Sequence, residues 1–189
     1  MSTSSRGHGR SFTLTRVGGF ALLSCAALTV GCQAPQKTTE APKSDEHVLL
    51  GATAPDFDLP RIGAADGAPR VRLRDTRGQV TVVDFWATWC APCRDSFPAY
   101  ERLVAERRDV TFVAVSVDEE PGGIPAFVEE TRVTFPVAWD EGQAVSQRYA
   151  PPTMPTSYVI DKNGVVRFVH AGFRAGDEGE LAAVIDGLR

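Results

Sequence analysis

The chain carries VTVVDFWATWCAPC at residues 80–93, where an apolar run leads directly into a C-x-x-C pair. The run is β-branched or aromatic apart from Asp84, which predicts a buried strand. Residues 92–107 predict a helix, so Cys90 is placed at a helix N-terminus. Free backbone N–H groups and the helix macrodipole stabilise a thiolate there, lowering its pKa to roughly 3.5–7.5 from about 8.5. Cys93 is near enough to close a disulfide, so the pair indicates dithiol–disulfide exchange.

Two other interpretations of the cysteine pair are a stabilising disulfide and half of a zinc site. A four-ligand zinc site normally requires a second pair of Cys or His residues. His47 and His170 are single and far apart in the sequence, and Cys25 and Cys32 lie in a segment expected to be removed or modified. We therefore expect no metal, and no cofactor other than the redox-active disulfide itself.

The N-terminal segment is organised like a secretory signal. Residues 1–16 contain three arginines and no acid, and residues 17–31 form an uncharged, mostly apolar run. Such a run is short for a transmembrane helix but suits a signal peptide. The stretch LTVGC at residues 28–32 resembles a bacterial lipobox, in which Cys32 is lipidated and becomes the mature N-terminus. An uncleaved anchor and ordinary signal-peptidase cleavage are the alternatives, and each of them also implies export.

The rest of the chain divides into a tether and one domain. Residues 33–46 are polar, contain prolines and lack apolar periodicity, which predicts a flexible tether. Residues 47–189 are long enough for one domain with its own core. Removal of residues 1–32 takes away three arginines and no acid, so the formal charge falls from −4 to −7. An acidic domain without a basic, aromatic patch is not expected to bind nucleic acid.

Strands and helices alternate after the cysteine pair. The order βαβαβαββα implies a parallel sheet edged by an antiparallel hairpin, with helices on both faces. Asn163-Gly164 is a strong signal for the turn of that hairpin. The predicted later strands are 110–117, 135–139, 156–161 and 165–171, and the predicted later helices are 125–132, 142–149 and 177–188.

Four stretches of the chain resemble the thioredoxin superfamily, at residues 51–59, 83–93, 154–156 and 161–164. Within it the chain is similar to the TlpA/ResA-like, membrane-tethered thiol–disulfide oxidoreductases, whose domain is of the AhpC/TSA–redoxin type. The likeness covers essentially all of residues 47–189. It implies an α/β thioredoxin fold, in which helices flank a central mixed sheet, with an N-terminal extension and a central helix–strand insertion.

The resemblance also implies roles for residues near the cysteines. Pro155 is expected to be a cis-proline beside the pair, where the backbone presents polar groups to a bound substrate chain. Asp84 is expected to move protons to and from Cys93 through water, and burial should raise the pKa of its carboxyl. The alternative is a structural Asp84 paired with a buried partner such as a lysine. The subfamily often has a Glu where this chain has Ser96, so the acid is supplied from the strand instead.

The expected substrate-contact surface lies around the cysteine pair. Trp89 is expected to be an apolar contact beside Cys90, whereas Trp86 is expected to pack in the core. The residues assigned to substrate binding are Trp89, Pro92, Met154 and Pro155.

The resemblance implies an exported enzyme that reduces disulfides of envelope proteins, with cytochrome c maturation or metal-site assembly as possible settings. Cys90 attacks the partner disulfide, Cys93 resolves the mixed disulfide, and a transmembrane reductant restores the dithiol. The protein would be held by its lipid on the periplasmic side of a membrane. The Ala-Pro dipeptide between the cysteines lacks the His of strongly oxidising sites. We therefore expect a potential nearer roughly −270 mV than about −120 mV.

Three alternatives remain open at this point. A thiol peroxidase shares the APDFDL motif at residues 54–59, but this chain lacks that family's Pro and Thr spacing ahead of Cys90. A copper-binding and delivery module would need a His or Met ligand near the pair, for which Met154 is the candidate. A purely structural binding domain would have an inert cysteine pair.

Overall fold

The computed structural model describes residues 47–63 and 70–189. The predictions for residues 1–46, which are the signal peptide, the lipidated Cys32 and the tether, lie outside these described residues. Within the described ranges, no helix combines the length and the apolar character that crossing a membrane requires.

The described residues form one mixed sheet of seven strands. The strands are β1 (Asp58–Ile62), β2 (Arg70–Arg72), β3 (Val80–Trp86), β4 (Val110–Ser116), β5 (Val137–Trp139), β6 (Thr156–Ile160) and β7 (Val166–Ala171). Their order in space is β2-β1-β5-β4-β3-β6-β7, which puts β3 between β4 and β6. β3 and β5 run parallel to β4, and the other pairings are antiparallel. The predicted mixed sheet is confirmed.

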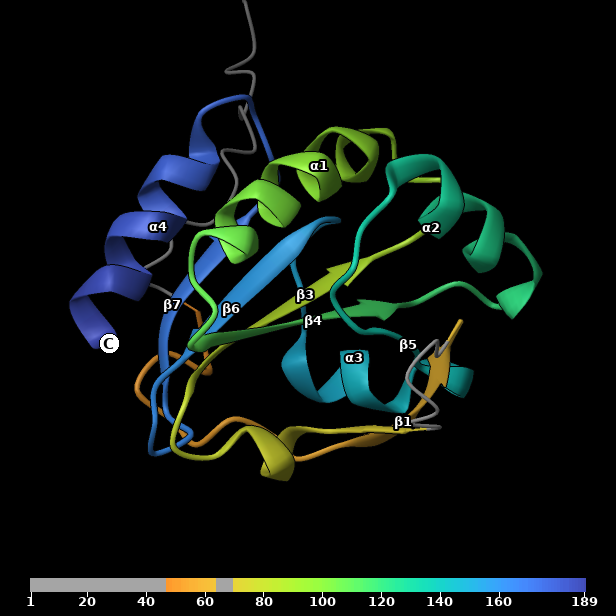
Figure 1. Cartoon of the computed structure of the whole chain (residues 1–189). Helices are drawn as coiled ribbons and strands as arrows, with labels where there is room; N and C mark the ends of the chain where they lie inside the picture. The colour runs from red at the N-terminus through yellow and green to blue at the C-terminus, as the bar shows by residue number, and fades with distance from the viewer. Residues whose placement is uncertain (1–46, 64–69) are drawn as a thin grey trace, which may run out of the picture. The chain divides into compact units, whose positions relative to one another are not determined.

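Four α-helices flank the sheet: α1 (Ala91–Ala105), α2 (Ile124–Thr131), α3 (Ala144–Tyr149) and α4 (Asp177–Leu188). Short 3-10 helices occupy Leu73–Thr76, Pro121–Gly123 and Glu141–Gln143. α1, α2 and α4 cover one face of the sheet and α3 lies on the other (Figure 1). Every helix and strand predicted from the cysteine pair onwards is present, with ends shifted by at most two residues. The thioredoxin-like α/β fold is therefore confirmed.

Strand β3 carries the centre of the core, and all seven of its residues are buried. Because successive side chains of a strand point to opposite faces, Asp84 and Trp86 share one face and Phe85 takes the other. The Trp86 ring packs on Phe97 of α1, with centroids 4.6 Å apart. The Phe85 ring packs on Tyr149 of α3 at 4.9 Å. Asp84 therefore projects into the layer between the sheet and α1.

The hairpin of β1 and β2 is not predicted by the sequence. β1 contains Pro60, and β2 has three residues with an arginine at each end, so neither has a clear apolar alternation. Both strands lie at one edge of the sheet, where proline and charged side chains are tolerated because one side of the backbone is unpaired. Asp58 accepts hydrogen bonds from Arg70 and Arg72 across the hairpin, which keeps this edge charged.

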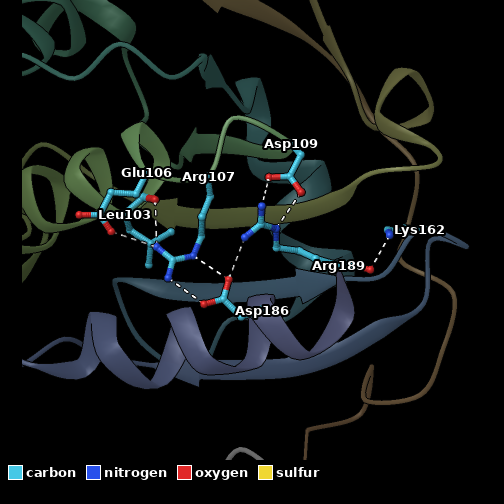
Figure 2. Close-up of polar contacts among 7 residues, drawn as sticks. All are labelled: Leu103, Glu106, Arg107, Asp109, Lys162, Asp186 and Arg189. Carbon is cyan, nitrogen blue, oxygen red and sulfur yellow. Dashed lines mark hydrogen bonds and ion pairs between the residues drawn. The ribbon is translucent and has the colours of Figure 1, made fainter.

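An ion-pair network holds α4 against the C-terminal end of α1 (Figure 2). Arg107 donates two hydrogen bonds to Asp186, at 2.9 and 2.8 Å, and these bonds lower the pKa of that carboxyl to about 2. Arg189 donates two more to Asp109, at 2.7 and 2.6 Å, and Lys162 donates to the main-chain oxygen of Arg189 at 2.7 Å. α1 is about 22 Å long at 1.5 Å per residue, so the network is well separated from its N-terminus.

Candidate active site

The cysteine pair forms a disulfide at the start of α1, with the two Cα atoms 5.3 Å apart. Cys90 is the N-cap of the helix, and Pro92 lies in its first turn without an N–H to donate. The Cys93 N–H therefore points at the Cys90 sulfur, with N and Sγ 3.2 Å apart. In the reduced protein this N–H and the helix N-terminus stabilise negative charge on Cys90.

The two sulfur-bearing residues differ in access. Cys90 is 4% exposed and borders an open pocket, whereas Cys93 is fully buried. An incoming disulfide or thiol can therefore reach the first cysteine only. This asymmetry separates an attacking thiol from a resolving thiol, as the sequence predicts.

A pocket of about 440 Å³ opens beside Cys90. Trp89 forms one wall and is 70% exposed, which is unusual for a large apolar ring. The Met154–Pro155 peptide bond is cis, as the resemblance implies, and Pro155 is buried behind the pocket wall. The structure thus brings three of the four residues assigned to substrate contact to one pocket. The lining residues are Trp89, Cys90, Ala91, Pro92, Thr153 and Met154.

Asp118 supports the loop that carries Trp89, a role the sequence does not reveal. Its carboxylate accepts hydrogen bonds from the Thr88 N–H at 3.1 Å and the Thr88 hydroxyl at 2.7 Å. The Ser116 hydroxyl donates to the same carboxylate at 2.6 Å. The available signal is position alone, because an acid that ends a buried strand lies at the sheet edge where the cysteines also lie.

Asp84 is fully buried on β3 and has one hydrogen-bonding neighbour. The Ser157 hydroxyl on β6 donates to Oδ1 of Asp84 at 2.6 Å, while Oδ2 has no hydrogen-bond partner among the described residues. Burial raises the pKa of the Asp84 carboxyl to about 7, and the hydrogen bond from Ser157 opposes this shift. The raised pKa agrees with the expectation from sequence. The partner is a serine rather than a lysine.

The buried face of α1 lies against the layer that contains Asp84. Cys93, Ser96, Phe97 and Tyr100 follow the i, i+3, i+4, i+7 spacing of one helix face, and all four are buried. The Ser96 hydroxyl donates to the Cys93 carbonyl at 3.2 Å and does not supply an acid. Cys93 and Asp84 therefore share the interior between β3 and α1, on the same side of the sheet.

No group of three or more His, Cys, Asp or Glu side chains placed to hold a metal occurs in the part of the chain that the structure describes.

The comparison with known families assigns the fold and its chemistry. A model of the AhpC/TSA family matches residues 50–169. The chain belongs to the AhpC/TSA family. ResA, a thiol-disulfide oxidoreductase of Oceanobacillus iheyensis, is 37% identical over 133 residues, which are 69% of each chain. The thioredoxin-like protein YneN of Bacillus subtilis is 32% identical over 148 residues, covering 76% of this chain and 84% of YneN.

Solved structures give the same assignment. A Chlorobium tepidum chain described as a thiol:disulfide interchange protein DsbE superposes with a TM-score of 0.68 at 37% identity. The match covers 74% of this chain and 96% of the other. This AhpC/TSA-family protein is accordingly a thiol–disulfide oxidoreductase with a thioredoxin-like fold, and Cys90 and Cys93 are its disulfide pair.

Proposed function

We propose that this oxidoreductase is exported, lipid-anchored and directed at disulfides of envelope proteins, which it reduces. The observation that carries the proposal is the asymmetric pair at the N-terminus of α1. Cys90 opens on a pocket with an exposed tryptophan, and Cys93 is buried behind it. A protein disulfide is large, so it can react only with a sulfur that faces outward.

The proposed cycle has two exchange steps and balances at each one. The Cys90 thiolate forms a bond to one sulfur of the partner disulfide, and the other partner sulfur leaves as a thiolate. The Cys93 thiol then loses its proton and attacks Cys90, which releases the second partner thiolate. Two electrons pass to the partner and Cys90–Cys93 is left oxidised. A membrane reductant that supplies two electrons through a dithiol restores the pair.

Asp84 is the proposed acceptor of the Cys93 proton. A buried thiol has a raised pKa, so its ionisation requires a base inside the same interior. Asp84 fits because its carboxyl has a pKa of about 7 and one oxygen without a partner among the described residues. A group that titrates near neutral pH can both take and return a proton during each turnover.

The proposed substrate contacts are the residues around the pocket. Trp89 offers its exposed ring to an apolar segment next to the partner cystine, and Met154 and Pro92 line the opposite walls. The backbone at Pro155 would pair with the extended partner chain. These contacts recognise an unfolded or extended segment and do not select a particular protein.

Capture of a mixed disulfide tests the order of attack. Reduced Cys93→Ser, mixed with insulin, is expected to retain insulin chains as an adduct that dithiothreitol releases, because nothing resolves the bond on Cys90. Cys90→Ser is the matched control and is expected to capture none, since its remaining sulfur is buried. Adducts are counted by mass spectrometry after acid quenching. Equal capture by both variants would remove the assigned roles. Envelope extracts then identify the physiological partner.

The anchor is tested separately at Cys32. The proposal rests on the basic start of the chain, the apolar run that follows and the small residues before this cysteine. In a bacterial host, the unmodified chain is expected in the membrane fraction and to incorporate labelled palmitate. Cys32→Ala is expected to lose the label, and Cys25→Ala is the matched control that keeps it. Labelling that survives the Cys32 change would exclude this anchor.

A further inference from the structure

Three buried side chains from three elements form a hydrogen-bonded chain in the interior. Asp84 comes from β3, Ser157 from β6 and Tyr100 from α1, and their exposed fractions are 0%, 0% and 1%. The Ser157 oxygen lies 2.6 Å from Oδ1 of Asp84 and 3.2 Å from the Tyr100 oxygen. Ser157 is the register partner of Asp84 in the β3–β6 ladder, so the sheet itself fixes this contact.

The direction of the protons follows from counting them. Ser157 has one hydroxyl proton, and the short contact places that proton on the ionised carboxylate of Asp84. The Tyr100 hydroxyl must then donate to the lone pair of Ser157. Burial and the charge of Asp84 raise the pKa of Tyr100 well above its usual range, so this hydroxyl keeps its proton and remains a donor.

Other ionisable groups near the chain leave this arrangement in place. Asp177 and Glu178 of α4 act on Tyr100 by charge and also raise the pKa of its hydroxyl. His170 of β7 lies opposite Ser157 in the β6–β7 ladder, but its Nε2 is 3.1 Å from Asp177, which holds the ring on α4. Cys93, on the same face of α1 as Tyr100, does not titrate while it is in the disulfide.

We propose that Tyr100 is a positioning residue for the exchange reaction: through Ser157 it holds Oδ1 of Asp84 in a hydrogen bond, leaving Oδ2 as the oxygen that takes the proton of Cys93. The proposal rests on the proposed role of Asp84 as the base. Donation from Tyr100 makes Ser157 a stronger donor, because hydrogen bonds in a chain polarise one another. The pair therefore sets the pH at which Asp84 changes its charge.

The test is a carboxyl titration of the oxidised protein, in which the cysteines do not titrate. The Asp84 carboxyl is followed by carbon-13 NMR against pH and assigned with Asp84→Asn. Ser157→Ala is expected to raise the titration midpoint by about one pH unit, because a hydrogen bond to the charged form is lost. Tyr100→Phe is expected to raise it by about half a pH unit. Ser157→Thr keeps a hydroxyl and is expected to restore the midpoint.

The matched control is Tyr158→Phe. Tyr158 is a neighbour of Ser157 on β6, is equally buried, and donates its hydroxyl to the Tyr149 carbonyl on the other face of the sheet. Its midpoint is expected to equal that of the unchanged protein, and thermal unfolding checks that every variant folds. A Tyr100→Phe midpoint that stays with the control would overturn the proposal, as would an equal rise in Tyr158→Phe.

A second readout separates this proposal from the proposed function. The release of insulin from Cys90 is timed against pH, and its half-maximal pH is expected to follow the carboxyl midpoint in each variant. If Asp84→Asn keeps the pH profile of the unchanged protein, the role of Asp84 as base fails, and the positioning role of Tyr100 fails with it. If Asp84→Asn changes the profile but Tyr100→Phe moves neither midpoint, only the inference about Tyr100 fails.

Discussion

Asp84→Asn is expected to stabilise the oxidised protein at pH 8 by about 4 kcal/mol more than at pH 4. The carboxyl is fully buried, and its pKa rises from an ordinary value of 3.8 to about 7 in the folded protein. An uncharged amide of the same shape removes the need to bury a charge at alkaline pH. Denaturant unfolding of both proteins across this pH range measures the difference.

The sign follows from proton counts in the two states. Below about pH 4 the carboxyl is protonated in both the folded and the unfolded chain, and its protonated form stabilises the fold fully. Between about pH 4 and pH 7 the folded chain still holds the proton that the unfolded chain has lost, so the free energy of unfolding falls as pH rises. Above pH 7 this contribution is gone. A pH-independent gap between the two proteins would show that Asp84 is not a strained buried acid.

The same substitution is expected to slow the reaction while it stabilises the fold. Loss of the base should reduce the release of reduced insulin by about 100-fold at pH 7, because general base catalysis contributes roughly 10²–10⁴. Capture of insulin on Cys90 should be little changed, since that thiolate depends on the helix N-terminus. Equal losses in capture and release would place the effect on the whole fold rather than on Cys93.

Trp86→Ala is expected to destabilise the protein by about 3–5 kcal/mol, the usual range for a buried aromatic side chain reduced to alanine. Its ring is fully buried between Phe97 and Phe127, with centroids 4.6 and 4.4 Å away. Thermal and denaturant unfolding measure the loss. Because the ring fills the layer between the sheet and two helices, no neighbouring side chain can occupy the space without moving α1 or α2.

Trp89→Ala is the matched control, three residues further along the chain. Its ring is 70% exposed, so its removal is expected to change the free energy of unfolding by less than about 0.5 kcal/mol. It should instead raise the KM for insulin and leave the reaction with a small dithiol reagent unchanged. A destabilisation as large as that of Trp86→Ala would contradict the assignment of Trp89 as a contact surface.

Much of the fold can be predicted from local pattern, because β3 to α4 have long apolar runs with clear breaks between them. The cysteine pair and the position of Cys90 at a helix N-terminus follow from the same stretch of sequence. The β1–β2 hairpin cannot be found in this way, since edge strands need no apolar alternation and Pro60 argues against a strand. Tyr100 and Ser157 are equally hidden. They join Asp84 only through the register of β6 and the rotation of α1, which are tertiary facts.

The burial of Cys93 behind Cys90 has a kinetic consequence. The electron donor and the electron acceptor must both form their bond at the same sulfur atom, so neither can bind while the other is attached. Turnover is therefore of the ping-pong type, in which each partner departs before the next arrives. Two proteins with opposite tasks must then offer this enzyme similar local surfaces, since both are read by the single doorway beside Trp89.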